Sequence, residues 1–298
     1  MPIRYLLPLK LAWERTKGLL FRPFRIEVWI VLGFAAWLAG LIDPSSGMQE
    51  VSKNGLDFSK ETSLSALEGL IAVSVILGVS ILAILIGVVL LWVSSRGKFV
   101  FLHNVLKENT EIKAPWAQYG RIGDSLFLWR LAFYAVAALV ALGFVLTLIL
   151  VARGGSVGTD LIEALAGASM LMLVAGFILL MIPFYCVTLA LNDFVVPLML
   201  KHNATATQAW GIFLPLLRER LPHFVVYLLF LAAARVVLAV ALGAVTLATC
   251  CIGGIILSIP FVGTVLLLPV HATYRGYSVE FLAQFGPPFA LEGTSAES

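Results

Sequence analysis

The chain has 298 residues, of which 60% are hydrophobic and only 12% are charged. Soluble domains carry about 25% charged residues, so this composition, with a mean hydropathy of +1.00, excludes an ordinary water-soluble protein. The formal net charge is only +3. We expect membrane lipids as partners and no nucleic acid. The composition therefore predicts an integral membrane protein.

The N-terminal stretch MPIRYLLPLKLAWERTKGLLFRPFR lacks the apolar core and cleavage site of a signal peptide. On a helix, Leu6, Leu9, Trp13 and Leu20 share one arc, and charged residues that include Lys10 occupy the other. This pattern predicts a helix that lies in the membrane interface with its basic face toward anionic headgroups.

Six apolar runs follow, and a run of about 20 helical residues crosses about 30 Å of hydrocarbon. They are approximately Glu27 to Ile42, Leu67 to Val93, Leu126 to Ala152, Leu161 to Leu191, His223 to Thr249 and Gly254 to Thr273. Pro183 lies in the fourth run, and Pro260 and Pro269 lie in the sixth, so we expect kinks there. The predicted fold class is an all-α polytopic membrane protein with six transmembrane helices.

The distribution of Lys and Arg predicts the orientation of these spans. The N-terminal segment and the segment 96–130 each carry six such residues, and the segment 192–222 carries three, whereas the alternate connections carry few. Since Lys and Arg favour cytoplasmic loops, we expect both termini in the cytoplasm and the chain in a bacterial inner membrane.

The two inner connections share a motif, Leu-Lys-x-Asn followed by six residues and a Trp, at an offset of 94 residues. The N-terminal helix offers a weaker copy at Trp13. Such self-similarity is typical of repeated structural units. We therefore predict three units, at about 1–94, 95–191 and 192–285, each an interfacial amphipathic helix followed by a two-span hairpin. The polar tail 286–298 is expected to be a disordered cytoplasmic segment.

Local signals support the interfacial helices. Thr205 and Gln208 form a capping box, and Pro115 suits a first helical turn. Gly97 and Gly276, each after an Arg, are expected to let the chain turn onto the surface where a span ends.

Headgroup contacts are expected from the basic, amide and Trp side chains of these inner segments. They are Lys10, Trp13, Arg96, Lys107, Asn109, Trp116, Lys201, Asn203, Trp210 and Arg275. The alternative is that the repeated motif is a structural anchor without lipid recognition.

The stretches RGKFVFLHNVL, SLFLWRLAF and YRGYSVEFLAQFG resemble those of bacterial six-span membrane proteins classed as domains of unknown function. More loosely, they are similar to the membrane domain found beside some glycerophosphodiester phosphodiesterases. Those relatives carry a separate catalytic barrel, and no segment of this chain is long and polar enough to form one. The resemblance therefore implies a membrane location and a span count but no hydrolysis.

No nucleophile elbow, phosphate-binding loop or dinucleotide fingerprint occurs in the chain, and the histidines are isolated, so we expect neither an enzyme nor a cofactor or metal. The first hypothesis is a protein that organises, senses or moves lipids at the inner leaflet. A small-solute or peptide permease and a membrane-embedded enzyme acting on lipid remain alternatives. Small residues at four-residue spacing, such as Ala239 and Gly243, permit packing within or between chains, which leaves a homo-oligomer or a membrane-protein partner open.

Arg235 lies in the middle of the apolar stretch LLFLAAARVVLAVALGAV. An Arg at the bilayer centre is costly, so we expect it to face the bundle interior, a wet cavity or a lipid phosphate. The expected side-chain partners are the hydroxyls of Tyr185, Thr188 and Ser258, since no deep carboxylate is expected nearby. An Arg that only braces kinked helices is the alternative to an anion or lipid-phosphate site.

Overall fold

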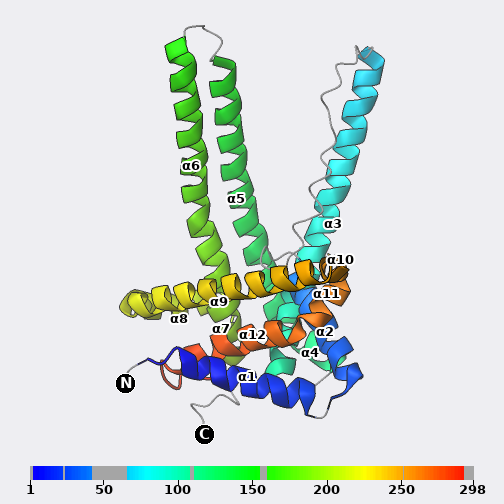
Figure 1. The fold of residues 1–298 in the computed structure, drawn as a ribbon, viewed down its shortest axis with the longest axis vertical. Helices are drawn as coiled ribbons and strands as arrows, with labels where there is room; N and C mark the ends of the chain where they lie inside the picture. Colours follow the sequence, from blue (N-terminus) through cyan, green and yellow to red (C-terminus); the bar gives the residue numbers. More distant parts are fainter. Residues whose placement is uncertain are drawn as a thin grey trace.

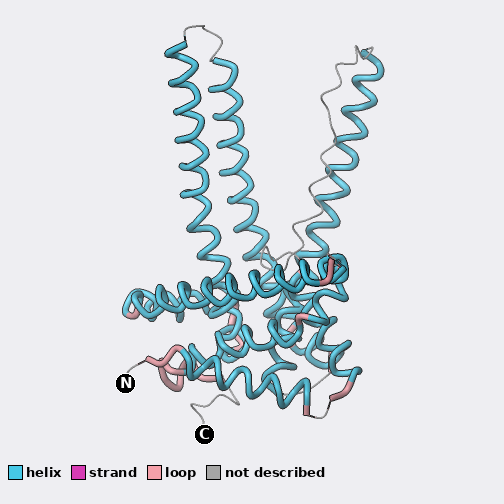
Figure 2. Tube along the Cα trace, viewed as in Figure 1, coloured by secondary structure: helices cyan, strands magenta, loops and turns pink. Residues whose placement is uncertain are grey.

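The computed structural model describes residues 3–22, 24–41, 66–107, 111–154, 160–250 and 252–291. Throughout these residues the regular structure is helical, with no strand, which confirms the predicted all-α class (Figure 2). Asn109 and residues 292–298, which figured in the sequence-based predictions, lie outside the described residues. The elements in chain order are α1 (Leu6–Phe21), α2 (Ile26–Gly40), α3 (Ala66–Lys107), α4 (Lys113–Gln118), α5 (Gly120–Gly154), α6 (Asp160–Ala190), the π-helix η2 (Leu191–Val195), α7 (Val196–His202), α8 (Ala206–Glu219), α9 (Leu221–Ala248), α10 (Ile252–Ser258), α11 (Pro260–Leu266) and α12 (Leu268–Ala283).

Four helical stretches of the described residues are long and apolar enough to cross a membrane. They are Ser74–Lys107, Gly120–Thr147, Ala175–His202 and Leu221–Ala248. Each coincides with one of the four middle predicted spans, and only 6–11% of the most apolar part of each is buried inside the structure. The first predicted span is the shorter apolar helix α2.

The sixth predicted span is not one continuous helix. The segment is divided into α10, α11 and the start of α12. Pro260 begins α11 and Pro269 lies in the first turn of α12, where the missing amide of proline costs no helical hydrogen bond. The expected kinks of this run are therefore confirmed as complete breaks, and the described residues do not form six uninterrupted spans.

The long helices stand on a base of shorter ones. Figure 1 shows α3, α5 and α6 extending in the same direction, with α5 and α6 forming a hairpin, while α9 runs crosswise over the ends of these helices nearest to α1 and α12. We call the base the assembly of α1, α4, η2, α7, α8, α12 and the C-terminal half of α3. The large exposed apolar side chains lie mostly on α3, α5, α6 and α9.

Three inner segments form the centre of the base. The C-terminal half of α3, the η2–α7 segment and α12 contact one another, and they bury apolar residues such as Phe99, Phe194 and Phe281 completely or almost completely. The amphipathic helices pack outside them, with α4 on α3, α8 on α7 and α1 on α12. The base thus has a hydrophobic core of its own, separate from the exposed surface of the long helices.

The sequence signals at the amphipathic helices are confirmed. The hydroxyl of Thr205 accepts from the backbone N–H of Gln208, whose side chain accepts from the Thr205 N–H, so α8 starts with a complete capping box. Pro115 lies in the first turns of α4. These local features place Trp116 and Trp210 close to the helix starts, as the repeated motif predicts.

The expectation for Gly97 and Gly276 is corrected. Neither glycine ends a helix, because α3 continues to Lys107 and α12 continues to Ala283. A Cβ atom at Gly97 would lie 2.9 Å from Cβ of Leu38 in α2, and a Cβ atom at Gly276 would lie 3.0 Å from Cβ of Ala12 in α1. Both glycines therefore let a neighbouring helix approach closely, which small residues permit in membrane helices.

The variant Gly97→Ala is expected to lower the free energy of unfolding by about 1–3 kcal/mol, because α2 must move away from α3 to make room for the methyl group. Gly87→Ala in the same helix is the matched control, since a Cβ atom at Gly87 meets no atom within 4 Å. The control should be neutral or slightly stabilising because alanine favours helix over glycine. Thermal unfolding in detergent compares the two, and equal melting temperatures would contradict the close contact.

Candidate functional site

Arg235 lies on α9 where this helix passes α6. Its Nη1 donates a hydrogen bond of 2.8 Å to the hydroxyl of Tyr185, which is 46% exposed. This partner is one of the three hydroxyls expected from the sequence. Because Tyr185 lies near the C-terminal end of α6, this hydrogen bond places the Arg235 guanidinium beside that end of α6, and α9 crosses the upright helices there (Figure 1).

The other two expected partners are elsewhere. Thr188 donates to the carbonyl of Phe184 at 2.9 Å, and Ser258 donates to the carbonyl of Ile255 at 2.7 Å. Both hydroxyls thus satisfy themselves on their own helices, as Ser and Thr commonly do. The structure brings only Tyr185 to Arg235.

Asp193 is an acidic residue in the electrostatic neighbourhood of Arg235. It lies on η2, which continues α6 into α7 as a π-helical segment, and its Oδ2 accepts a 3.1 Å hydrogen bond from the hydroxyl of Tyr227. The side chains of Arg275, Arg235 and Lys98 act electrostatically on this carboxylate. Asp193 lies beyond the C-terminal end of α6 and is half-buried, so it does not alter the expectation that no carboxylate lies deep in a span beside Arg235.

The π-helix explains why the sequence pattern missed Asp193. A π-bulge inserts an extra residue into a helix and is frequent at functional sites, and here the π-helical segment contains Asn192 and Asp193. The 3.6-residue period that runs through α6 therefore does not predict which way these side chains point. The available signal was the acid itself, since an ionisable residue next to a long apolar run is a functional hypothesis by default.

Arg275 is a second cation near Asp193, and we call Arg235, Tyr185, Asp193, Tyr227 and Arg275 the polar centre. It was expected at the lipid surface, but its guanidinium donates to the backbone carbonyl of Asn192, which lies next to Asp193. It is half-buried in α12, within the base. Arg275 therefore links α12 to η2, and its predicted headgroup contact stays a prediction.

Arg96 is also used inside the protein. It donates two hydrogen bonds to the Asp124 carboxylate, at 3.0 Å from Nε and 2.8 Å from Nη2, and its guanidinium lies 4.5 Å from the Trp92 ring centre and 5.9 Å from that of Trp116. A Cβ atom at Gly123 would lie 2.7 Å from its Cγ, so this glycine makes room for the side chain. The bidentate pair joins α3 to α5, and such geometry is among the strongest for Arg.

The residues of the repeated motif have structural roles in the third copy. Lys201 donates to the carbonyls of Pro287 and Ala290, Asn203 ends α7 in the left-handed conformation with φ of 47°, and the Trp210 ring stacks on Trp129 at 5.6 Å. These contacts favour the alternative of a structural anchor at this copy. Asn tolerates the left-handed conformation better than most residues, which suits a helix end.

The segment after α12 is packed as far as the structure describes it. Ala290 and Leu291 are 1% and 3% exposed, and the His202 ring lies 3.0 Å from the carbonyl of Pro288. The prediction of a disordered tail from residue 286 is therefore corrected for residues 286–291.

Other expected headgroup contacts remain on the surface. Lys10 and Lys107 are exposed, and Trp13 is 41% exposed. Trp116 is half-buried, with its ring 6.1 Å from that of Trp92. Of the basic residues expected to meet lipid, the cations of α1 and the end of α3 are thus the ones left on the surface.

The fold and the polar centre define an all-helical integral membrane protein with four candidate spans on a packed base. Residues 7–291 match the model described as "Family of unknown function (DUF7544)", and the chain belongs to this family. The match agrees with the resemblance to proteins of unknown function and gives no link to a glycerophosphoryl diester phosphodiesterase domain. No curated protein and no solved structure matches the chain.

The variant Asp193→Asn is expected to lower the free energy of unfolding by about 3 kcal/mol, because the cations Arg275, Arg235 and Lys98 lose a half-buried counter-charge. Tyr227→Phe removes only one hydrogen bond to the same carboxylate and should cost about 1 kcal/mol. Thermal or denaturant unfolding in detergent measures both variants. If Asp193→Asn were no more destabilising than Tyr227→Phe, the carboxylate would not act as the counter-charge.

Proposed function

We propose that this protein is a non-enzymatic inner-membrane protein that binds phospholipids at the cytoplasmic leaflet, with Arg235 meeting a lipid phosphate. The observation that supports this function best is the burial and the hydrogen-bond partner of the Arg235 side chain. It is half-buried, it lies in an apolar helix, and its hydrogen bond goes to a neutral hydroxyl.

The surroundings of Arg235 favour an anion from the bilayer. Among the described residues, no carboxylate lies within ion-pair distance of its guanidinium, and the Tyr185 contact uses one of several N–H donors. The neighbouring Val236 and Val237 are 62% and 69% exposed, so the cation is bordered by surface that suits acyl chains. Arg binds phosphate well because its planar donors fit two oxygens at once.

The position of α9 supports the same function. Figure 1 shows this helix crossing the ends of α3, α5 and α6 where the long apolar helices meet the base. If α3, α5 and α6 lie in hydrocarbon, this level corresponds to the headgroup region, and α9 lies along it without spanning, although its length and hydropathy would allow it to span. A phosphate is expected there, whereas the bilayer centre would offer Arg235 none.

We also propose that the chain is built from three repeated units, as the 94-residue offset indicates. The packing supports this arrangement, because each amphipathic helix lies on the helical segment that follows a predicted second span: α4 on the end of α3, α8 on α7 and α1 on α12. The last contact joins the first unit to the third. A closed ring of three units would explain why α1, at the start of the chain, packs against α12, near its end.

The variant Arg235→Leu is expected to abolish retention of one phosphatidylglycerol molecule by the purified protein. Tyr185→Phe should weaken retention only a few-fold, because a single neutral hydrogen bond contributes about 0.5–1.5 kcal/mol. Native mass spectrometry with added phosphatidylglycerol measures the bound lipid, and an excess of inorganic phosphate tests whether the headgroup alone is recognised.

Arg218→Leu is the matched control, since Arg218 is an exposed cation of α8 outside this site. It should retain lipid as the wild type does. Unchanged lipid retention in Arg235→Leu, at an unchanged melting temperature, would overturn the proposed function.

A further inference from the structure

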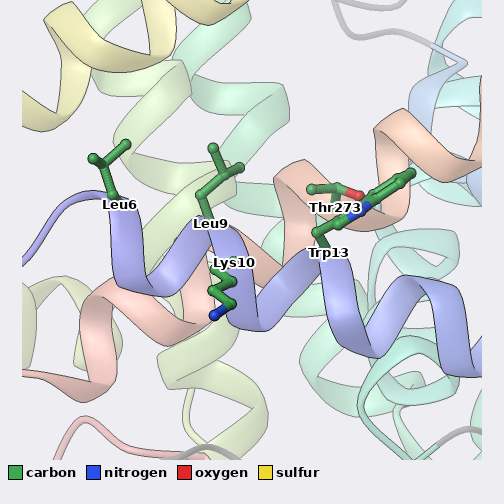
Figure 3. Close-up of a pocket in the computed structure, with 5 residues that line it drawn as sticks. All are labelled: Leu6, Leu9, Lys10, Trp13 and Thr273. Carbon is green, nitrogen blue, oxygen red and sulfur yellow. The ribbon is translucent and has the colours of Figure 1, made fainter.

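A second surface that suits lipid binding lies on α1, outside the Arg235 site. A groove of about 360 Å³ is lined by Leu6, Leu9, Lys10, Trp13 and Thr273. Figure 3 shows Leu6 and Leu9 pointing to one side of α1, Trp13 lying toward Thr273 of α12, and Lys10 pointing to the other side. The groove therefore has apolar walls and one cation at its border.

The groove is built on a firmly held helix. Ala12 packs against Gly276, where an added Cβ would lie 3.0 Å from Cβ of Ala12, and the Thr273 hydroxyl donates to that of Thr16 at 3.2 Å. The buried Glu280 carboxylate accepts a 2.9 Å hydrogen bond from Arg15. These contacts fix α1 on α12, so the apolar side chains of α1 remain exposed because the helix cannot turn them inward.

The exposure of these side chains calls for an apolar occupant. Leu6 is 70% exposed and Trp13 is 41% exposed, and burying such side chains is favourable at about 25 cal/mol per Å² of apolar surface. The groove volume is at the lower end of the range for ligand pockets, about 300–1,000 Å³. A groove of this size suits one hydrocarbon chain better than a whole lipid molecule.

The charge at the groove selects the headgroup. Lys10 is exposed, and none of the described acidic side chains forms an ion pair with it. The nearby Lys17, by contrast, is paired with Glu14 at 3.2 Å and lies 5.6 Å from the Trp13 ring centre. An unneutralised cation beside an apolar wall complements an anionic amphiphile.

We propose that this groove binds one acyl chain of an anionic phospholipid drawn from the leaflet that borders the base, with Lys10 meeting its phosphate. This inference rests on the proposed function for the placement of the base at the membrane surface. Its occupant is separate from the lipid at Arg235, because no residue is shared between the two sites.

The test uses the fluorescence of Trp13 in the full-length protein in vesicles. Brominated phosphatidylglycerol and brominated phosphatidylcholine quench nearby tryptophans, and the difference between wild type and Trp13→Phe isolates the signal of Trp13. The proposal predicts stronger quenching by the anionic lipid, and a reduction of this preference by about fivefold in Lys10→Gln, as expected for one surface cation near a membrane. Lys17→Gln is the matched control and should keep most of the preference, because that lysine already has an acidic partner.

A second pair of variants tests the groove itself. Leu6→Gln should reduce the quenching of Trp13, whereas Leu7→Gln should not, since Leu7 is exposed on the same turn but does not line the groove. Equal quenching by both lipids, or equal effects of the two leucine variants, would overturn the proposal. Quenching of Trp13 that persists in Arg235→Leu would show that the groove binds lipid independently of the Arg235 site. Absence of Trp13 quenching, with lipid still retained at Arg235, would overturn only this inference.

Discussion

The constraint on which the structure depends is the apolar surface of its long helices. Residues such as Leu82, Leu139 and Leu179 are 58–70% exposed, and hydrocarbon is the medium in which this exposure costs nothing. The base has a different basis for stability, because three inner segments bury a continuous aromatic and aliphatic core. The protein thus has an apolar part made of long helices and a packed base, and Arg235 lies where these two parts meet.

The cations of the described residues fall into two groups: those that bind an acceptor of another helix and those without a carboxylate partner. Arg96 is held by Asp124, and Arg275 is held by the backbone of η2, so both join helices. Arg235 and Lys10 have no carboxylate partner among the described residues. The proposed lipid contacts follow from this division, since a cation that already has a protein partner has little to gain from a phosphate.

The sequence predicted the membrane class, four helices long and apolar enough to cross a membrane, the capping box at Thr205 and the Tyr185 partner of Arg235, because each depends on local pattern or hydropathy. It predicted kinks at Pro260 and Pro269 but did not predict that the helix ends completely there. It also did not predict that Gly97 would serve close packing inside a helix, because this depends on which helix lies opposite. The contacts of Asp193 were not predicted for the same reason. Its surroundings are set by a π-helical segment and by side chains distant in sequence, which periodicity does not reveal.

The central claim is that the long helices stand in hydrocarbon while the base faces water on one side. Single cysteines, introduced after replacement of the native ones by serine, test it through labelling by a membrane-impermeant maleimide. The account predicts that Leu82→Cys and Leu139→Cys stay unlabelled in intact membranes, and that Arg218→Cys is labelled only in inverted vesicles. Labelling of Leu82→Cys as fast as Arg218→Cys would contradict it.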